Sequence, residues 1–135
     1  MSQENVEIVR AIYVPWGRGD FSSAEWAHPE IEFTIADGPT RGSWTGLDGM
    51  AEAYQAEWLS AWEEFRVEPE KFRELDDERV LVLSHFSGQG KTSGLDVEQM
   101  VTKGAELFEV RGGKVTRLVI WAERGDAIAE LGLSE

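Results

Sequence analysis

Apolar residues in the first half of the chain recur every three or four positions, the period of a helix with one buried face. This pattern predicts a helix over residues 3–14, capped by Ser2 and ended by Pro15, which has no amide donor and crowds the preceding turn. The apolar positions of this predicted helix and its end are Val6, Val9, Tyr13 and Trp16.

A second helix is predicted over residues 47–62, because Thr45 and Asp48 have the spacing of a capping box. Between the two helices, residues 31–36 predict a short strand, and residues 37–44 predict a turn-rich loop. The inner stripe of the second helix is broad and aromatic, and consists of Met50, Tyr54, Trp58, Ala61 and Trp62.

The period changes to two after Phe65, which is typical of strands. Four strands are predicted, within residues 65–75, 79–91, 96–110 and 114–123, and a short helix over residues 125–133 ends the chain. Helices followed by an antiparallel meander predict an α+β fold, with a curved, cone-shaped sheet and the N-terminal helices on its concave face. The 135 residues suit a single domain spanning residues 1–135.

The last two strands meet at Gly112-Gly113, which suits a two-residue hairpin turn. That turn places Val110 opposite Val115 and Glu106 opposite Val119. Glu106 would then share one face with Phe108, Val110, Val115, Val119 and Trp121. Two interpretations stay open: Glu106 is a desolvated acid in a pocket, or it is a carboxylate that pairs with Arg117 or faces solvent.

Composition excludes several classes of function. The absence of cysteine removes disulfides, zinc–thiolate sites and thiol nucleophiles, and a net charge of −13 opposes nucleic acid and anionic membranes. Two histidines without metal-ligand spacing predict no metal site, and no cofactor fingerprint is present. The first ten residues, MSQENVEIVR, do not resemble a secretion signal and no apolar run could span a membrane, so we expect a cytoplasmic protein.

Asp37 and His85 are further candidates for chemistry. Asp37 precedes a glycine, so it is either a turn residue or a base at the mouth of a pocket. His85 is either a packed or edge residue of its strand or a catalyst, because histidine is the residue type whose unperturbed pKa lies near neutral pH. Large aromatic residues fill cores and also line apolar pockets. The candidates for contacts with a ligand are Tyr13, Trp16, Phe33, Tyr54, Trp58, Phe108, Val119 and Trp121.

The order of several segments resembles a SnoaL-like member of the nuclear transport factor superfamily. These segments are RGSWTGLDGMAEAY, FRVEPEKFRELDDERVLVL, SGQGKTSG and LFEVRGGKVTRLVIWAERGDAIAELGL. The resemblance covers nearly the whole chain and implies a cone-shaped fold, a pocket between helices and sheet, and a homodimer. Related activities include ketosteroid isomerisation, polyketide cyclisation, dehydration and epoxide hydrolysis, so the fold alone does not fix the function.

The resemblance carries over only in part to individual residues. Glu106 falls where ketosteroid isomerases have an aspartic acid that is kept neutral as an oxyanion donor, an arrangement already described for that enzyme. The isomerase tyrosine would fall at Ile12, one residue and about 100° from Tyr13. Its base would fall at Ile35, two residues before Asp37. The histidine and aspartate of the related cyclases correspond loosely to His85 and Asp37.

Two hypotheses follow. The first is a cofactor-free enzyme that transfers a proton next to the carbonyl group of a hydrophobic small molecule, in an isomerisation, cyclisation or dehydration. Glu106 would be the acid or hydrogen-bond donor, assisted by Asp37 or His85, with Trp58, Phe108 and Trp121 as apolar walls. The second is a pocket protein without chemistry, which binds a ligand or serves as a dimerisation domain.

Overall fold

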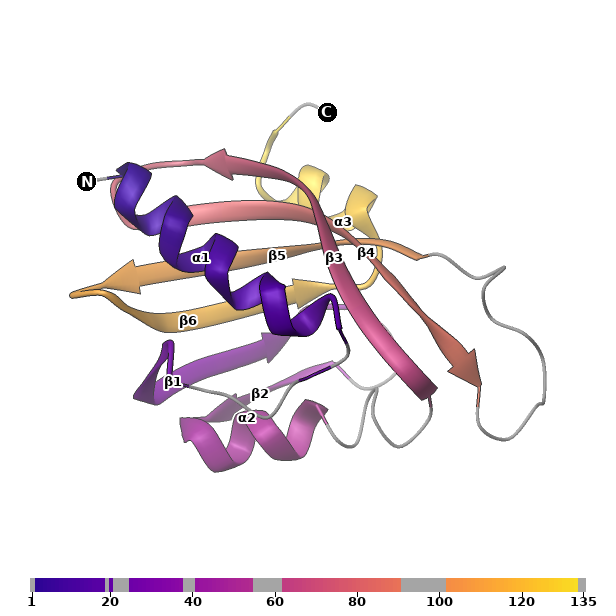
Figure 1. Ribbon diagram of the computed structural model, residues 1–135. Helices are drawn as coiled ribbons and strands as arrows, with labels where there is room; N and C mark the ends of the chain where they lie inside the picture. Colours follow the sequence, from indigo (N-terminus) through magenta and orange to yellow (C-terminus); the bar gives the residue numbers. More distant parts are fainter. Residues whose placement is uncertain are drawn as a thin grey trace.

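The computed structural model describes residues 2–18, 20, 25–37, 41–54, 62–90 and 102–133. Within them three helices accompany one six-stranded sheet, which confirms the predicted α+β class (Figure 1). The elements are α1 (Ser2–Trp16), β1 (Ala27–Ile35), β2 (Gly42–Thr45), α2 (Gly46–Tyr54), β3 (Trp62–Glu74), β4 (Arg79–Gly90), β5 (Thr102–Arg111), β6 (Lys114–Trp121) and α3 (Arg124–Glu130).

The sheet is curved and does not close, and its strands are ordered β2-β1-β6-β5-β4-β3. The β1–β6 pair is parallel, whereas all other neighbours are antiparallel. Helix α1 crosses the inner face of the sheet, and α3 lies behind it on the outer face (Figure 1). No helix in the described part of the chain is long and apolar enough to cross a membrane.

Several predicted boundaries are wrong. Helix α1 continues through Pro15 to Trp16, since a proline in the last turn removes only one hydrogen bond near a helix end. Strand β1 begins at Ala27, earlier than predicted, and β2 forms within the predicted loop. The second predicted helix reaches too far, because α2 is described only to Tyr54 and Trp62 already belongs to β3.

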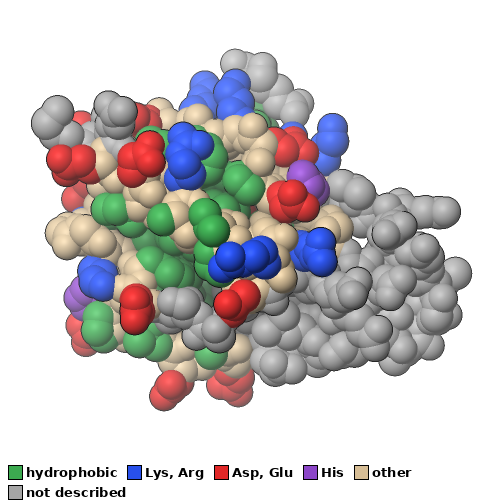
Figure 2. Space-filling model, viewed as in Figure 1, with side chains coloured by type: hydrophobic (Ala, Val, Ile, Leu, Met, Phe, Trp, Pro, Cys, Tyr) green, Lys and Arg blue, Asp and Glu red, His purple; other side chains and the backbone are tan. Residues whose placement is uncertain are grey.

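Two apolar cores lie on opposite faces of the sheet. The inner core joins α1 and α2 to the sheet and includes Tyr13, Trp16, Phe33, Met50, Val82, Phe108 and Ile120. The outer core packs under α3 and consists of Leu81, Leu83, Ala105, Leu107, Val119, Trp121 and Ala127. Over α1, charged side chains of both signs surround a band of apolar ones (Figure 2).

The hairpin between β5 and β6 contains a β-bulge. The turn and the first pairs after it are as predicted, with Val110 opposite Val115. Glu109 then faces Arg117, so Thr116 is an extra residue in β6. A bulge of this kind moves every later residue of its strand to the other face.

The bulge changes the neighbours of Glu106. Its partner in β6 is Ile120, not Val119. The prediction that Val119 and Trp121 share the face of Glu106 is therefore wrong, and both pack in the outer core. Glu106 instead shares the inner face with Phe108, Val110, Val115, Leu118 and Ile120.

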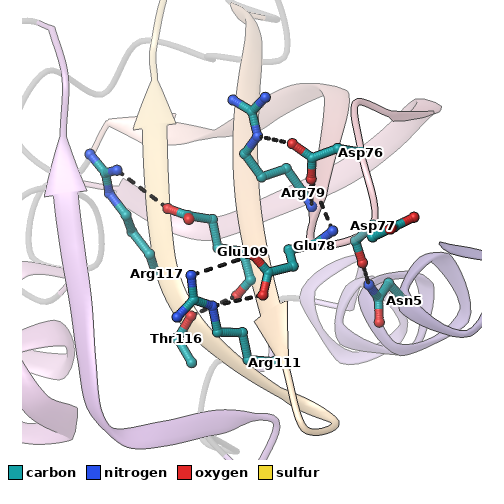
Figure 3. A network of polar contacts seen from close by, with 9 residues as sticks. All are labelled: Asn5, Asp76, Asp77, Glu78, Arg79, Glu109, Arg111, Thr116 and Arg117. Carbon is teal, nitrogen blue, oxygen red and sulfur yellow. Dashed lines mark hydrogen bonds and ion pairs between the residues drawn. The ribbon is translucent and has the colours of Figure 1, made fainter. Parts of the chain in front are cut away.

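At one end of the sheet, polar contacts join the turn between β3 and β4 to α1 and to β5 (Figure 3). The Asn5 amide donates to the Asp77 carbonyl at 2.7 Å, next to the β3–β4 turn. Arg111, at the end of β5, pairs with Glu78 at 2.9 Å. Since Asn5 and Tyr13 belong to the same helix, the contact of Asn5 with Asp77 helps to fix where Tyr13 lies over the sheet.

Gly104 in β5 is required by a close approach of the backbone and a ring. A Cβ atom there would lie 2.7 Å from the Phe86 ring and 2.7 Å from the Trp121 carbonyl oxygen. Such distances force neighbouring groups to shift. At Gly125 in α3, by contrast, a Cβ atom would have no neighbour within 4 Å.

We predict opposite effects of alanine at these two glycines. Gly104→Ala should lower the free energy of unfolding by about 1–3 kcal/mol, the usual effect of overpacking. Gly125→Ala should raise it by about 0.5–1 kcal/mol, because alanine loses less backbone entropy than glycine when it adopts a helical conformation. Urea unfolding of the two variants beside the parent measures both changes. Equal stability of the Gly104 variant and the parent would contradict the predicted crowding.

Candidate functional site

Glu106 lies in the middle of β5 and points into the inner core. Its neighbours across the sheet are Val82 in β4 and Ile120 in β6. The side chain is 1% exposed, and every residue of β5 from Gly104 to Phe108 is buried. A carboxyl group in such surroundings needs hydrogen-bond partners, because burial without them is costly.

Two hydroxyl groups supply these partners. The Tyr13 hydroxyl, from α1, donates to Oε1 of Glu106. The Ser84 hydroxyl, from β4, donates to Oε2 at 2.7 Å. The predicted alternative, an ion pair with Arg117, is wrong: Arg117 contacts Glu109 at 3.3 Å (Figure 3).

Burial raises the pKa of Glu106 from its ordinary 4.5 to about 7, because desolvation disfavours the charged form. The hydrogen bonds from Tyr13 and Ser84 and the positive charge of Arg124 act in the opposite direction and lower this pKa. Desolvation is the largest of these effects. A carboxyl with this pKa holds both protonation states in comparable amounts at neutral pH, which suits a general acid or base.

Aromatic rings hold Tyr13 in place. Its ring contacts Trp16, Phe72 and Phe108 edge-on, with centroids 5.1, 6.0 and 5.9 Å away. Edge-to-face packing of this kind stabilises one orientation of the ring. Trp16 and Phe108, both predicted to contact a ligand, are thus buried around the phenol that donates to Glu106.

Asp37 is placed away from Glu106. Its Oδ1 accepts a hydrogen bond from the amide of Ala122 at 2.7 Å, and its Oδ2 accepts one from the amide of Glu123 at 3.0 Å. The carboxylate therefore connects the segment after β1 to the turn between β6 and α3, a structural role. The described contacts do not bring Asp37 to the inner core.

His85 lies on the outer face of the sheet. It follows Ser84 in β4, and neighbouring strand residues point to opposite faces. Its Nδ1 is 3.0 Å from Glu70 and its Nε2 is 3.8 Å from Glu68. The sheet therefore separates His85 from Glu106, and the predicted cooperation of the two is not supported by this arrangement.

The remaining predicted ligand contacts are divided between the two faces. Phe33 lies in the inner core, whereas Val119 and Trp121 lie in the outer one, where the Trp121 indole donates to Glu130 at 2.8 Å. Trp58 and the side chain of Tyr54 lie outside the described residues.

A cavity of about 340 Å³ opens on the outer face between β1, β2 and β6. Val119 lines it together with Thr34, Ser43, Arg41, Arg117 and Glu130. Since Thr34, Ser43 and Val119 stand opposite one another in the sheet, they face away from Glu106. Among the described residues, no group of three or more His, Cys, Asp and Glu side chains is placed to hold a metal ion.

Ser84 and Tyr13 complete a site that the sequence only partly predicts. Alternation in the run LVLSHF puts Ser84 on the same face as Val82 and Phe86, so one polar residue among apolar ones was a visible signal. The contact between Tyr13 and Glu106 had no local signal, because it depends on how α1 crosses the sheet.

Comparison with known proteins identifies the fold and the family. No curated protein matches the chain significantly. Solved structures do: TerC, co-crystallised with polyporic acid, has 23% identity, a TM-score of 0.70, and coverage of 95% of this chain and 97% of TerC.

Two further structures have nearly the same TM-score as TerC. A protein of ketosteroid isomerase-like fold from Catenulispora acidiphila DSM 44928, in complex with trimethylamine, has 17% identity and a TM-score of 0.69, with 95% and 94% of the two chains covered. A protein from Xanthomonas campestris pv. campestris, which its name proposes as a polyketide cyclase, has 21% identity, a TM-score of 0.69, and coverage of 96% and 98%.

At these identities the similarity shows the fold. The family is shown by the sequence itself, because the profile of the SnoaL-like domain matches residues 9–118, most of the chain. This chain belongs to the family of SnoaL-like domain proteins.

Proposed function

We propose that this protein is a cofactor-free enzyme that transfers a proton next to the carbonyl group of a hydrophobic small molecule. The observation that carries the proposal is the Glu106 carboxyl, buried in the inner core and poised to titrate near pH 7. The structural neighbours support a small-molecule ligand, since TerC was co-crystallised with polyporic acid and the Catenulispora protein is in complex with trimethylamine. A homodimer and a cytoplasmic location remain predictions.

In the proposed reaction Glu106, in its neutral form, donates its proton to the substrate, or in its charged form accepts one from a carbon next to the carbonyl. The hydroxyls of Tyr13 and Ser84 stabilise the carboxylate that remains after donation. Each carboxylate oxygen has a second lone-pair position, so a substrate group that enters the inner core could bind there while both hydroxyls stay bound. Phe108 and Trp16 would form part of the apolar wall.

A second function, ligand binding without chemistry, is favoured by another observation. Within the described residues, the hydrogen bonds to Glu106 come from Tyr13 and Ser84, and neither hydroxyl normally titrates near neutral pH. Asp37 and His85, the predicted assistants, make contacts elsewhere. A site with one titratable group can bind and polarise a carbonyl without completing a reaction.

We predict that Glu106→Gln lowers kcat/KM by ~10²–10⁴-fold, the usual contribution of a general acid or base. The amide keeps the shape of the side chain and can still accept from Tyr13. The test is turnover of a panel of β,γ-unsaturated cyclic ketones, followed by the absorbance of the conjugated product. The kcat of the parent should depend on pH, and the midpoint of this dependence should lie near the Glu106 pKa of about 7.

Glu52→Gln, at an exposed position of α2, is the matched control and should leave turnover unchanged. Full activity of Glu106→Gln on a substrate that the parent converts would exclude the proposed role. If neither the parent nor Glu106→Gln converts any ketone of the panel, but a bound ketone quenches the tryptophan fluorescence of both, the function without chemistry is the correct one.

The buried carboxyl also predicts how stability depends on pH. The unfolded chain ionises Glu106 near its ordinary pKa of 4.5, whereas the folded protein keeps the proton up to about 7. The folded state therefore binds more protons than the unfolded state between these pH values. The stabilising contribution of Glu106 to the free energy of unfolding is fully present below about pH 4.5 and is lost as pH rises through about 7. The difference amounts to about 3 kcal/mol, at roughly 1.4 kcal/mol for each unit.

Urea unfolding of the parent and Glu106→Gln at about pH 4.5 and about pH 8 measures this contribution. The parent should lose about 3 kcal/mol more than the variant over this interval. Glu52→Gln should follow the parent. A parent and a Glu106→Gln variant with parallel pH profiles would show that the carboxyl is solvated in the folded protein.

A further inference from the structure

Arg124, the first residue of α3, reaches the strand pair that carries Glu106 from the outer side of the sheet. Its Nη2 donates to the Ser84 carbonyl at 2.7 Å, and its Nε donates to the Gly104 carbonyl at 3.3 Å. Ser84 and Gly104 stand opposite each other in β4 and β5. The Arg124 guanidinium thus bridges β4 and β5 at Ser84, whose hydroxyl binds Glu106, and at Gly104, two residues before Glu106.

A second set of contacts holds Arg124 in this position. Its Nη2 lies 2.8 Å from a Glu70 oxygen, and the other oxygen of Glu70 is 3.0 Å from His85. Glu70 occupies the irregularity in β3 between the residues that pair with Ser84 and Leu83, so it has no partner in the ladder. The Arg124 side chain is 11% exposed, which reduces the screening of its charge by water.

Ser84 connects the two faces of the sheet. Its carbonyl accepts from Arg124, while its hydroxyl donates to Glu106 at 2.7 Å. A shift of the backbone at Ser84 would therefore move the hydroxyl that binds the carboxylate. The positive charge of Arg124 also favours negative charge on Glu106, since opposite charges attract each other.

We propose that Arg124 is a positioning residue for Glu106: from the opposite face of the sheet it holds the Ser84 hydroxyl in place and stabilises the charged carboxylate. The inference concerns the same site as the proposed function and rests on it for any role in turnover. It adds that the reactivity of the inner site depends on a residue that no substrate in that site would touch.

The charged groups around Arg124 determine whether removing a charge raises or lowers the pKa of Glu106. Glu70, from β3, offsets part of the guanidinium charge, and Glu68 lies on the same strand near His85. From β5, Lys103 pairs with His85 across the ladder and is exposed. Removing the Arg124 charge should make Glu106 harder to ionise, whereas removing the Glu70 charge should make it easier to ionise.

The test is the pKa of Glu106, measured by carboxyl-carbon NMR titration in the full chain, with Glu106→Gln to assign the signal. Arg124→Met should raise the pKa by roughly 0.5–1.5 units, as expected for a unit charge several ångströms away at an effective dielectric constant near 20. Arg124→Lys keeps the charge and should stay closer to the parent. Glu70→Gln should shift the pKa downward.

Arg111→Met is the matched control, because Arg111 lies in the same strand as Glu106 but forms an exposed pair with Glu78. It should leave the pKa of Glu106 unchanged. Thermal unfolding and near-ultraviolet circular dichroism show whether each variant is folded, and Arg124→Gln replaces Arg124→Met if the latter is not. A folded variant without the Arg124 charge and with the parental pKa would overturn the inference.

The titration needs no substrate, so its outcome is independent of the proposed function. If Arg124→Met leaves the pKa of Glu106 unchanged while turnover depends on Glu106, only the inference about Arg124 is refuted. A clear Arg124 effect in a protein that converts no ketone would refute the proposed catalysis alone.

Discussion

The burial of one carboxyl group constrains most of the inner core. Glu106 is 1% exposed, and a buried acid is tolerated only where donors meet its oxygens. One donor comes from α1 and the other from β4, so the helix and the sheet must dock in one relative position. Desolvation exceeds the effect of both hydrogen bonds, and the carboxyl therefore remains easy to protonate near neutral pH.

A single extra residue in β6 decides what surrounds this carboxyl. Strand alternation predicted Glu106, the hairpin turn and the first pairs after it, because these depend on local sequence. Alternation could not predict the bulge, at which the Thr116 hydroxyl donates to the Glu109 carbonyl at 3.3 Å. Trp121 consequently packs under α3 and not beside Glu106, which no local pattern would have revealed.

The candidate site shows the same division between local and distant information. The sequence identified Glu106, and the superfamily resemblance placed an acid there, but neither identified its two donors. Tyr13 was assigned to the buried face of its helix, yet its contact with Glu106 depends on the crossing of α1 over the sheet. For Asp37 and His85 the sequence left a structural and a pocket role open, because only the tertiary arrangement shows that they bind backbone amides and outer-face carboxylates.

The energetics of Glu106 argue that the fold alone does not explain its presence. Apolar residues in place of Glu106, Tyr13 and Ser84 together would leave no buried polar group without a partner, and such replacements of a whole buried polar cluster are often neutral or stabilising. The carboxyl instead weakens the folded state above neutral pH by about 3 kcal/mol, a large part of the stability of a small domain. Strained or costly groups that the surrounding structure holds in place are typical of functional sites. The hydroxyls of Tyr13 and Ser84 and the positive charge of Arg124 all lower the pKa of Glu106, against the effect of desolvation. These contacts stabilise the charged form of Glu106, which is what the proposed proton donor requires.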